Sequence, residues 1–299
     1  MSVNNTTFLY NIFGIQISSD IEFPLLTQLN NGPVQLTICY VSTIKEAQYS
    51  FSNAFFSCNA DEMLVKLPHD SKILIRNANL IQYNTKSPEV SVFLLGSAMA
   101  AALLQNKVFL LHATSLVYRN KAFSISGISG AGKSTLAAYL NKKGIPILAD
   151  DVTALNNKKG IPLVLPGIPI FKLWRDALKL LSINEELPRV RAELEKFYYS
   201  TNEKYDQTAT LSTIFILNSK NANEFVLREI SGTEKFNLLR KHSYRYQYIE
   251  PMGLSQWHFN ECIRLSATTR VIKITRPRHN EDIEKLANMV LQQLVNSEH

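Results

Sequence analysis

The chain has 299 residues, of which 45% are hydrophobic and 19% charged, and its formal net charge is +7. That composition excludes disordered and fibrous proteins, and the length allows one large domain or two smaller ones. Most of the positive excess falls after residue 130. The excess suits a polyanionic ligand, although a solvated basic surface would give the same count.

The cysteines and the apolar segments bear on where the protein works. Cys39, Cys58 and Cys262 are widely spaced and follow no metal-binding or disulfide pattern, which is typical of a reducing compartment. The N-terminal segment lacks the features of a secretory signal. The most apolar run, Val92–Leu104, is shorter than a membrane span. We therefore expect a soluble, cytoplasmic protein with no membrane partner.

Short β-favouring runs alternate with turn residues in the first part of the chain, which predicts a β-rich N-terminal region over residues 1–87. After it, Ser87 as N-cap and Pro88 at the first helical position predict a buried helix that runs to Leu104. The predicted strands are Ile12–Ser18, Val34–Val41, Ala54–Cys58, Met63–Leu67 and Lys72–Ile75.

From Val108 the pattern changes to long apolar strands that alternate with helices. This pattern indicates an α/β fold with buried strands, and we expect one catalytic domain over residues 88–299. The predicted strands are Val108–Tyr118, Ala122–Ser126, Ile145–Ala149, Thr213–Leu217, Phe225–Glu229 and Val271–Thr275, and the predicted helices are Lys133–Lys142, Lys172–Leu181, Arg189–Phe197 and Asn280–Val295.

The segment from Gly127 to Ser134 satisfies the phosphate-binding pattern G-x-x-x-x-G-K-[ST], after a predicted strand and before a predicted helix. In such a loop the backbone N–H groups and the helix N-terminus receive phosphates, the lysine reaches the β- and γ-phosphates, and the serine hydroxyl is a ligand for Mg²⁺. The sequence therefore predicts ATP and Mg²⁺ as cofactors. The predicted nucleotide-binding residues are Gly127, Ser129, Gly130, Ala131, Gly132, Lys133, Ser134 and Thr135.

Two adjacent carboxylates, Asp150 and Asp151, end the predicted strand that follows the loop helix, only 17 residues after Lys133. Both strands should end at the same edge of the sheet, so one carboxylate can hold Mg²⁺ while the other accepts the proton of an attacking hydroxyl. Adjacent residues on a strand point to opposite faces, so both can serve only if the strand ends or bends there. The alternative for Asp151 is a turn cap.

His112 lies on the apolar strand that leads toward the loop. A lone histidine in such a strand is often a core residue, but an imidazole near phosphate can also stabilise transferred charge. Further basic candidates for contacts with phosphates or an acidic acceptor are Lys172, Arg175, Arg189, Arg191, Lys196, Lys241, His242 and Arg245.

These residues together resemble the catalytic domain of the HPr kinase/phosphorylase family, which is similar in fold to phosphoenolpyruvate carboxykinase. The similar segments are the strand His112-Ala-Thr-Ser-Leu-Val, the loop from Gly127 to Ser134, and Leu148-Ala-Asp-Asp. The resemblance implies a P-loop core with a mixed sheet, His112 and Asp150 at the reaction centre, Asp150 as the base toward a serine hydroxyl, and Lys133 on the transferred phosphate. We assign Asp151, with Ser134, to the metal.

Other segments, among them Pro166–Trp174, look like a divergent subgroup of this family, some members of which phosphorylate lasso-peptide precursors. Two departures matter. Thr135 follows the loop serine where the HPr enzymes usually have glutamate, and no segment resembles their LxxRGxG motif. HPr as substrate and the phosphorylase reaction are therefore not expected here.

Three functions fit these features. The first is a kinase that phosphorylates a serine or another hydroxyl of a peptide or small protein. The second is a kinase for a small hydroxylated metabolite, and the third is a nucleotide-responsive binding protein without transfer activity. No nucleic-acid partner is expected, since the aromatic and basic residues from Tyr244 to Tyr248 stand beside no RNA-binding fingerprint. A homo-oligomer is compatible with the sequence.

Overall fold

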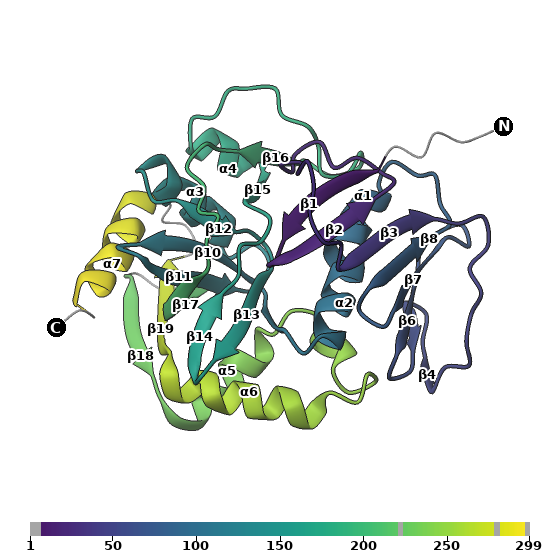
Figure 1. The fold of residues 1–299 in the computed structure, drawn as a ribbon. Helices are drawn as coiled ribbons and strands as arrows, with labels where there is room; N and C mark the ends of the chain where they lie inside the picture. Colours follow the sequence, from purple (N-terminus) through teal and green to yellow (C-terminus); the bar gives the residue numbers. More distant parts are fainter. Residues whose placement is uncertain (1–6, 221–223, 278–281, 297–299) are drawn as a thin grey trace. The chain divides into compact units, whose positions relative to one another are not determined.

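The computed structural model describes residues 7–220, 224–277 and 282–296 (Figure 1). The chain forms two compact units, one of residues 1–110 with 245–260 and the other of residues 111–244 with 261–299. The boundary predicted at residue 88 falls inside the first unit, because the helical segment after it packs on a strand of the N-terminal sheet. No helix in the described part of the chain is both long and apolar enough to span a membrane.

The first unit is built on an eight-stranded sheet with the order β1-β2-β3-β8-β7-β6-β5-β4. Strand β3 pairs in parallel with β2 and β8, and the other neighbours are antiparallel. The predicted β-rich region is therefore confirmed. The strands are β1 (Phe8–Ile12), β2 (Ile15–Ser19), β3 (Leu36–Tyr40), β4 (Phe51–Ser52), β5 (Phe56–Cys58), β6 (Glu62–Lys66), β7 (Lys72–Arg76) and β8 (Leu80–Tyr83).

The predicted apolar helix is one helical run with a π-helical centre, made of α1 (Val90–Phe93), η1 (Leu94–Ala98) and α2 (Met99–Gln105). It begins later than predicted, with Glu89 as N-cap. Its residues from Met99 to Leu104 are all buried, and the run packs on β7. The apolar composition of this segment thus serves a protein core.

The second unit holds a mixed sheet in which β12, β10, β11 and β17 are successive neighbours and β19 joins β17 to β18. The pairs β11–β17 and β17–β19 are parallel, whereas β10–β11, β10–β12 and β18–β19 are antiparallel. The predicted α/β class with a mixed sheet is confirmed. The strands are β10 (Ala113–Tyr118), β11 (Lys121–Gly127), β12 (Ile147–Ala149), β13 (Thr153–Lys158), β14 (Ile161–Val164), β17 (Ala209–Lys220), β18 (Val226–Ile230) and β19 (Arg270–Pro277), with β9 (Phe109–Leu111) leading into β10.

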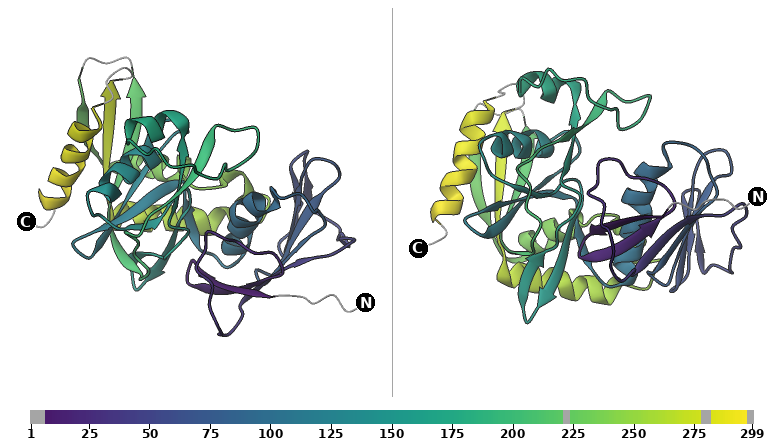
Figure 2. Two further views of the ribbon diagram at one scale, coloured as in Figure 1. Left: turned by 90° about the horizontal axis from the view of Figure 1, so that it is seen from above. Right: turned by 45° about the horizontal axis from the view of Figure 1, so that its top comes forward.

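Helices α3 (Lys133–Lys142) and α7 (Ile283–Val295) lie side by side and share one hydrophobic core with the sheet (Figure 2). Phe123 and Phe215 meet edge to face in this core at 6.1 Å. The predicted start of the last helix at Asn280 lies outside the described residues, and the described helix begins after its N-cap Asp282. The remaining helices are α4 (Arg175–Leu180), α5 (Gly232–Lys241), η2 (Tyr246–Tyr248) and α6 (Ser255–Thr268).

Two predicted helices are wrong in whole or in part, because a hairpin of β15 (Ile170–Trp174) and β16 (Lys196–Ser200) stands there. The helix predicted over Lys172–Leu181 begins only at Arg175. The helix predicted over Arg189–Phe197 is absent, and Phe197 pairs with Leu173 across the hairpin. The apolar residues of this segment have helical spacing, but they are buried by pairing between two strands, so the helix prediction was wrong there.

Candidate active site

The loop between β11 and α3 has the backbone that a phosphate site requires. Gly132, the N-cap of α3, has a φ of 96°, which favours glycine. A Cβ at Gly127 would lie 2.5 Å from the carbonyl oxygen of Leu217, so only glycine fits the close approach of β11 to β17. The Lys133 ammonium donates to the carbonyls of Gly127 at 3.0 Å and Ile128 at 3.3 Å. The lysine is thus held against the loop it serves.

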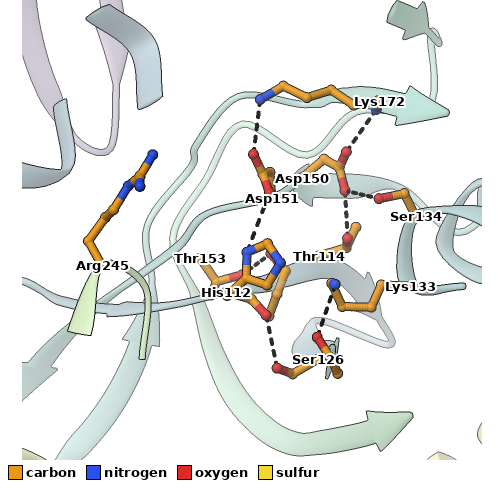
Figure 3. A network of polar contacts seen from close by, with 12 residues as sticks. His112, Thr114, Ser126, Lys133, Ser134, Asp150, Asp151, Thr153, Lys172 and Arg245 are labelled. Carbon is orange, nitrogen blue, oxygen red and sulfur yellow. Dashed lines mark hydrogen bonds and ion pairs between the residues drawn. The ribbon is translucent and has the colours of Figure 1, made fainter. Parts of the chain in front are cut away.

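Asp150 is buried directly after β12 and accepts three hydrogen bonds (Figure 3). Its Oδ1 accepts from the hydroxyls of Thr114 at 2.6 Å and Ser134 at 2.9 Å. Its Oδ2 accepts from the backbone N–H of Lys172 at 2.9 Å. The carboxylate therefore joins the loop helix, β10 and the β15–β16 hairpin.

Asp151 faces a different set of groups because the backbone turns sharply at this residue. Its φ is 71°, and the N–H of Val152 donates to the carbonyl of Asp150 at 2.9 Å. Oδ2 of Asp151 lies 3.0 Å from Nζ of Lys172, and Oδ1 lies 3.4 Å from Nδ1 of His112. The end of the strand and this left-handed residue let two adjacent carboxylates serve one site, which a continuing strand would prevent.

The charges around Asp151 fix its protonation state. Burial alone would raise the pKa of Asp151, but the nearby Lys172 and His112 lower it to about 2. Burial opposes the charge of Lys172 as well, yet the Asp151 carboxylate raises the pKa of that ammonium above its usual range. At neutral pH the two residues therefore form an ion pair at the centre of the site.

His112 interrupts what the sequence predicts as one strand from Val108 to Tyr118. Its backbone N–H donates to the backbone carbonyl of His242 at 2.8 Å, and its ring stacks on that of Tyr244 with centroids 5.8 Å apart. Burial and the nearby Lys133 lower the pKa of His112, although Asp151 opposes the shift. The imidazole is therefore neutral at pH 7, and it presents a ring nitrogen to Asp151.

Hydroxyl groups beneath these residues form a buried network that sequence reasoning missed. Ser115 shares hydrogen bonds of 2.7 Å with Ser124 and with Thr153, and Thr153 donates to the carbonyl of Ala113 at 3.1 Å. Ser126 donates to the carbonyl of His112 at 2.9 Å. The available signal was the hydroxyl residues inside two apolar strands, Thr114 and Ser115 on one and Ser124 and Ser126 on the other. The network ties β10, β11 and β13 together under the candidate site.

A cavity of about 540 Å³ opens over this cluster. Its wall includes all loop residues from Ser129 to Thr135, together with His112, Asp151 and Lys172. Of the site residues predicted from the sequence, Gly127 and Asp150 are not part of this lining, although Asp150 contacts the lining residue Ser134. Most of the residues predicted from the sequence are thus brought to one cavity, with Asp150 as their buried support.

Of the other basic candidates, Lys196 also lines the cavity, whereas Arg175 and Arg189 pair with Glu195 and pack over the Phe197 ring. Arg191 pairs with Glu193. Arg245 donates to Ser97 at 2.6 Å in the first unit.

Sequence reasoning missed Arg276, which lines the cavity and donates to the carbonyl of Ala131 at 3.3 Å. Arg276 lies in β19, 145 residues after Ala131 in the chain, so no local signal in the sequence indicates the contact.

The donor set fits Mg²⁺ bound together with a nucleotide. The described residues contain no group of three histidine, cysteine or acidic side chains that would hold a metal alone. Mg²⁺ instead prefers one or two carboxylates, a hydroxyl and phosphate oxygens. The Ser134 hydroxyl and the Asp150 carboxylate lie 2.9 Å apart at the N-terminus of α3, where phosphates would supply the remaining ligands.

No family model matches the chain, and no curated protein matches its sequence. Among solved structures, the chain is similar to the HPr(Ser) kinase/phosphatase from Coxiella burnetii. The two share 15% identity with a TM-score of 0.35, and the likeness covers 64% of this chain and 99% of that chain.

Proposed function

We propose that the protein is an ATP- and Mg²⁺-dependent kinase that transfers the γ-phosphoryl group to a hydroxyl of a peptide or small protein. One observation carries the proposal. A phosphate loop with its lysine and serine shares a cavity with a paired aspartate, Asp151, while a second aspartate, Asp150, contacts the loop serine. A site for phosphate, metal and proton acceptor is what transfer to a hydroxyl requires.

Ser134 and Asp150 would hold the metal, which supplies positive charge to the phosphate oxygens. Lys133 and the loop N–H groups stabilise the negative charge that spreads over the transferred group. Lys172 keeps the Asp151 carboxylate oriented toward the cavity through its ion pair of 3.0 Å, and Nδ1 of His112 lies 3.4 Å from the other carboxylate oxygen.

The sequence assigned the base to Asp150 and the metal to Asp151, and the geometry favours the reverse. Asp150 is buried, accepts three hydrogen bonds and lies below the cavity. Asp151 lines the cavity and is ionised, so its carboxylate can accept the hydroxyl proton.

The acceptor class is the part of the proposal that rests on motif resemblance, which favours a serine of a ribosomal precursor peptide. Its test is incubation of the protein with ATP, Mg²⁺ and a panel of serine-containing candidate peptides, read by intact mass. We expect one peptide to gain a phosphoryl group, and its serine-to-alanine version to gain none. A Lys133→Met variant should transfer nothing. Phosphorylation of small metabolites with no peptide modified would contradict the peptide acceptor.

A further inference from the structure

The cavity over the phosphate loop continues into a region that the chemistry of phosphoryl transfer does not use. His112, Asp151 and Lys172 belong to its polar wall. Away from them, apolar side chains come from three separate places, namely α4, the segment before β18, and the first turn of α7, with the carboxylates of Asp176 and Asp282 beside them. The apolar side chains there are Ala177, Leu180, Phe225, Ile283 and Leu286.

This apolar wall is attached to the same helix that begins at the phosphate loop. Leu286 and Ala177 belong to the core that includes Leu136 of α3, and Phe225 and Ile283 pack against that core. Helix α7 also contacts α3 directly. The apolar wall and the phosphate loop are therefore parts of one rigid core, and a ligand held by both would have a fixed orientation.

Charge divides the cavity in the same way. The cations Lys133, Lys172 and Lys196 line it on the side of the carboxylate pair, and Arg276 reaches the loop at the Ala131 carbonyl. The α7 end instead carries the Asp282 carboxylate, which caps that helix by accepting from the N–H of Lys285 at 2.8 Å. A carboxylate repels phosphate but accepts hydrogen bonds from hydroxyl or amino groups. Phosphates thus fit one end, and an uncharged polar and flat group fits the other.

We propose that the wall formed by Leu180, Phe225, Ile283 and Leu286 binds the adenine base and ribose of ATP. This inference rests on the proposed function, because it uses the loop as the site of the triphosphate. A purine has two apolar faces and a polar edge, which suits an aromatic ring and aliphatic side chains beside a carboxylate. Phe225 offers one ring face at this wall, and Lys285 lies over the ring at 5.4 Å from its centroid.

The size of the cavity agrees with this occupant. A volume of about 540 Å³ lies within the range of about 300–1,000 Å³ that is usual for small-molecule sites. The triphosphate alone would leave the apolar wall exposed to water. An apolar side chain of the acceptor is the competing occupant, and the test below separates the two.

The test compares ATP with inorganic tripolyphosphate, which has the phosphates but no nucleoside, by calorimetry in the presence of Mg²⁺. The key variant is Leu180→Asn, since Leu180 is 39% exposed and tolerates a polar side chain without loss of the core, and an amide adds no charge that would repel phosphate. Ile263→Asn is the matched control, because Ile263 on α6 is 47% exposed and lies away from the cavity wall. Phe225→Ala is a second cavity variant, and thermal melting checks that each variant folds.

We expect the wild-type protein to bind ATP at least tenfold more tightly than tripolyphosphate. Leu180→Asn and Phe225→Ala should raise the Kd for ATP at least fivefold and leave the Kd for tripolyphosphate within twofold. Ile263→Asn should change neither. Equal wild-type affinities for the two ligands, or variants that weaken both alike, would overturn the nucleoside site. So would an unchanged ATP affinity with a raised peptide KM, which would mark an acceptor pocket.

Failure of the proposed function gives a different result. In that case the wild-type protein would bind neither ATP nor tripolyphosphate, which contradicts the phosphate site itself. If the protein binds tripolyphosphate tightly and binds ATP with the same affinity, the phosphate site stands. Only the proposal that the apolar wall binds the nucleoside is then overturned.

Discussion

The ammonium group of Lys172 lies 3.0 Å from Oδ2 of Asp151, and the backbone N–H of the same lysine donates to Asp150 at 2.9 Å. One residue of β15 therefore contacts both carboxylates of the pair. The side-chain contact keeps Asp151 ionised, and the backbone contact orients Asp150. Lys172 is a positioning residue of the proposed kinase, and its removal should leave a distinct signature.

A Lys172→Met variant should shift the acid limb of the pH–rate profile upward by at least about one pH unit. The reason is that Lys172 holds the pKa of Asp151 down at about 2. A base with a depressed pKa is active above that pKa and is lost as the pH falls through it, so a raised pKa moves the loss to higher pH. The measurement is kcat/KM for peptide phosphorylation across the acidic range.

Lys172→Arg provides the control, because it keeps the positive charge and should keep the acid limb near its wild-type position. A Lys172→Met enzyme whose activity falls equally at every pH would show that the lysine acts on the fold or on substrate binding, and would contradict its role on Asp151.

Gly127→Ala should destabilise the protein by more than about 3 kcal/mol, because the new Cβ meets a backbone oxygen at 2.5 Å and the φ is 151°. Gly144→Ala is the matched control, since Gly144 also has a positive φ, 87°, but no atom lies within 4 Å of its added Cβ. Its cost should be only the backbone strain of about 1–2 kcal/mol. Urea unfolding of the two variants gives the comparison, and equal costs would mean that the approach of β11 to β17 is not tight.

His242 should make the folded state sensitive to acid. Burial lowers its pKa to about 4, with Lys241 and His112 acting in the same direction. The unfolded chain then binds a proton near pH 6.5 that the folded chain binds only near pH 4, so stability falls as the pH drops through this window. The contribution is about 3 kcal/mol at its full extent.

A His242→Gln variant should therefore lose less stability than the wild-type protein between pH 7 and pH 4.5. Urea unfolding at both pH values gives the loss in the free energy of unfolding for each protein. The difference between the two losses isolates His242, because all other titratable groups are the same in both proteins. Identical losses in wild type and variant would show that His242 takes up its proton without penalty in the folded protein.

Sequence patterns predict those parts of the fold that local signals specify. The loop at Gly127 to Ser134 follows a glycine-rich motif, and the strands β10, β11, β12, β17 and β19 lie in apolar runs. The β15–β16 hairpin was missed because Val190, Leu194 and Phe197 have helical spacing, while the pairing of Phe197 with Leu173 depends on tertiary contacts. Propensity and spacing cannot express such pairing.

The site shows the same division. The residue types of the loop and the carboxylate pair indicate phosphate and metal chemistry from the sequence alone. Which aspartate faces the cavity depends on the φ of 71° at Asp151 and on the approach of Lys172, neither of which leaves a mark in the sequence. Arg276 reaches the loop from a strand 145 residues away in the chain.

The most direct test of the account is single-turnover transfer of the labelled γ-phosphoryl group from ATP to an acceptor peptide by an Asp151→Asn variant. The account predicts a loss of at least about 100-fold in the transfer rate, since removal of a positioned proton acceptor typically costs that much. The Kd for ATP should stay within threefold of the wild-type value, because Lys133, Ser134 and the loop amides are unchanged. Transfer at the wild-type rate by this variant would contradict the assignment of Asp151 as the base, and the absence of transfer and of ATP binding in the wild-type protein would contradict the kinase itself.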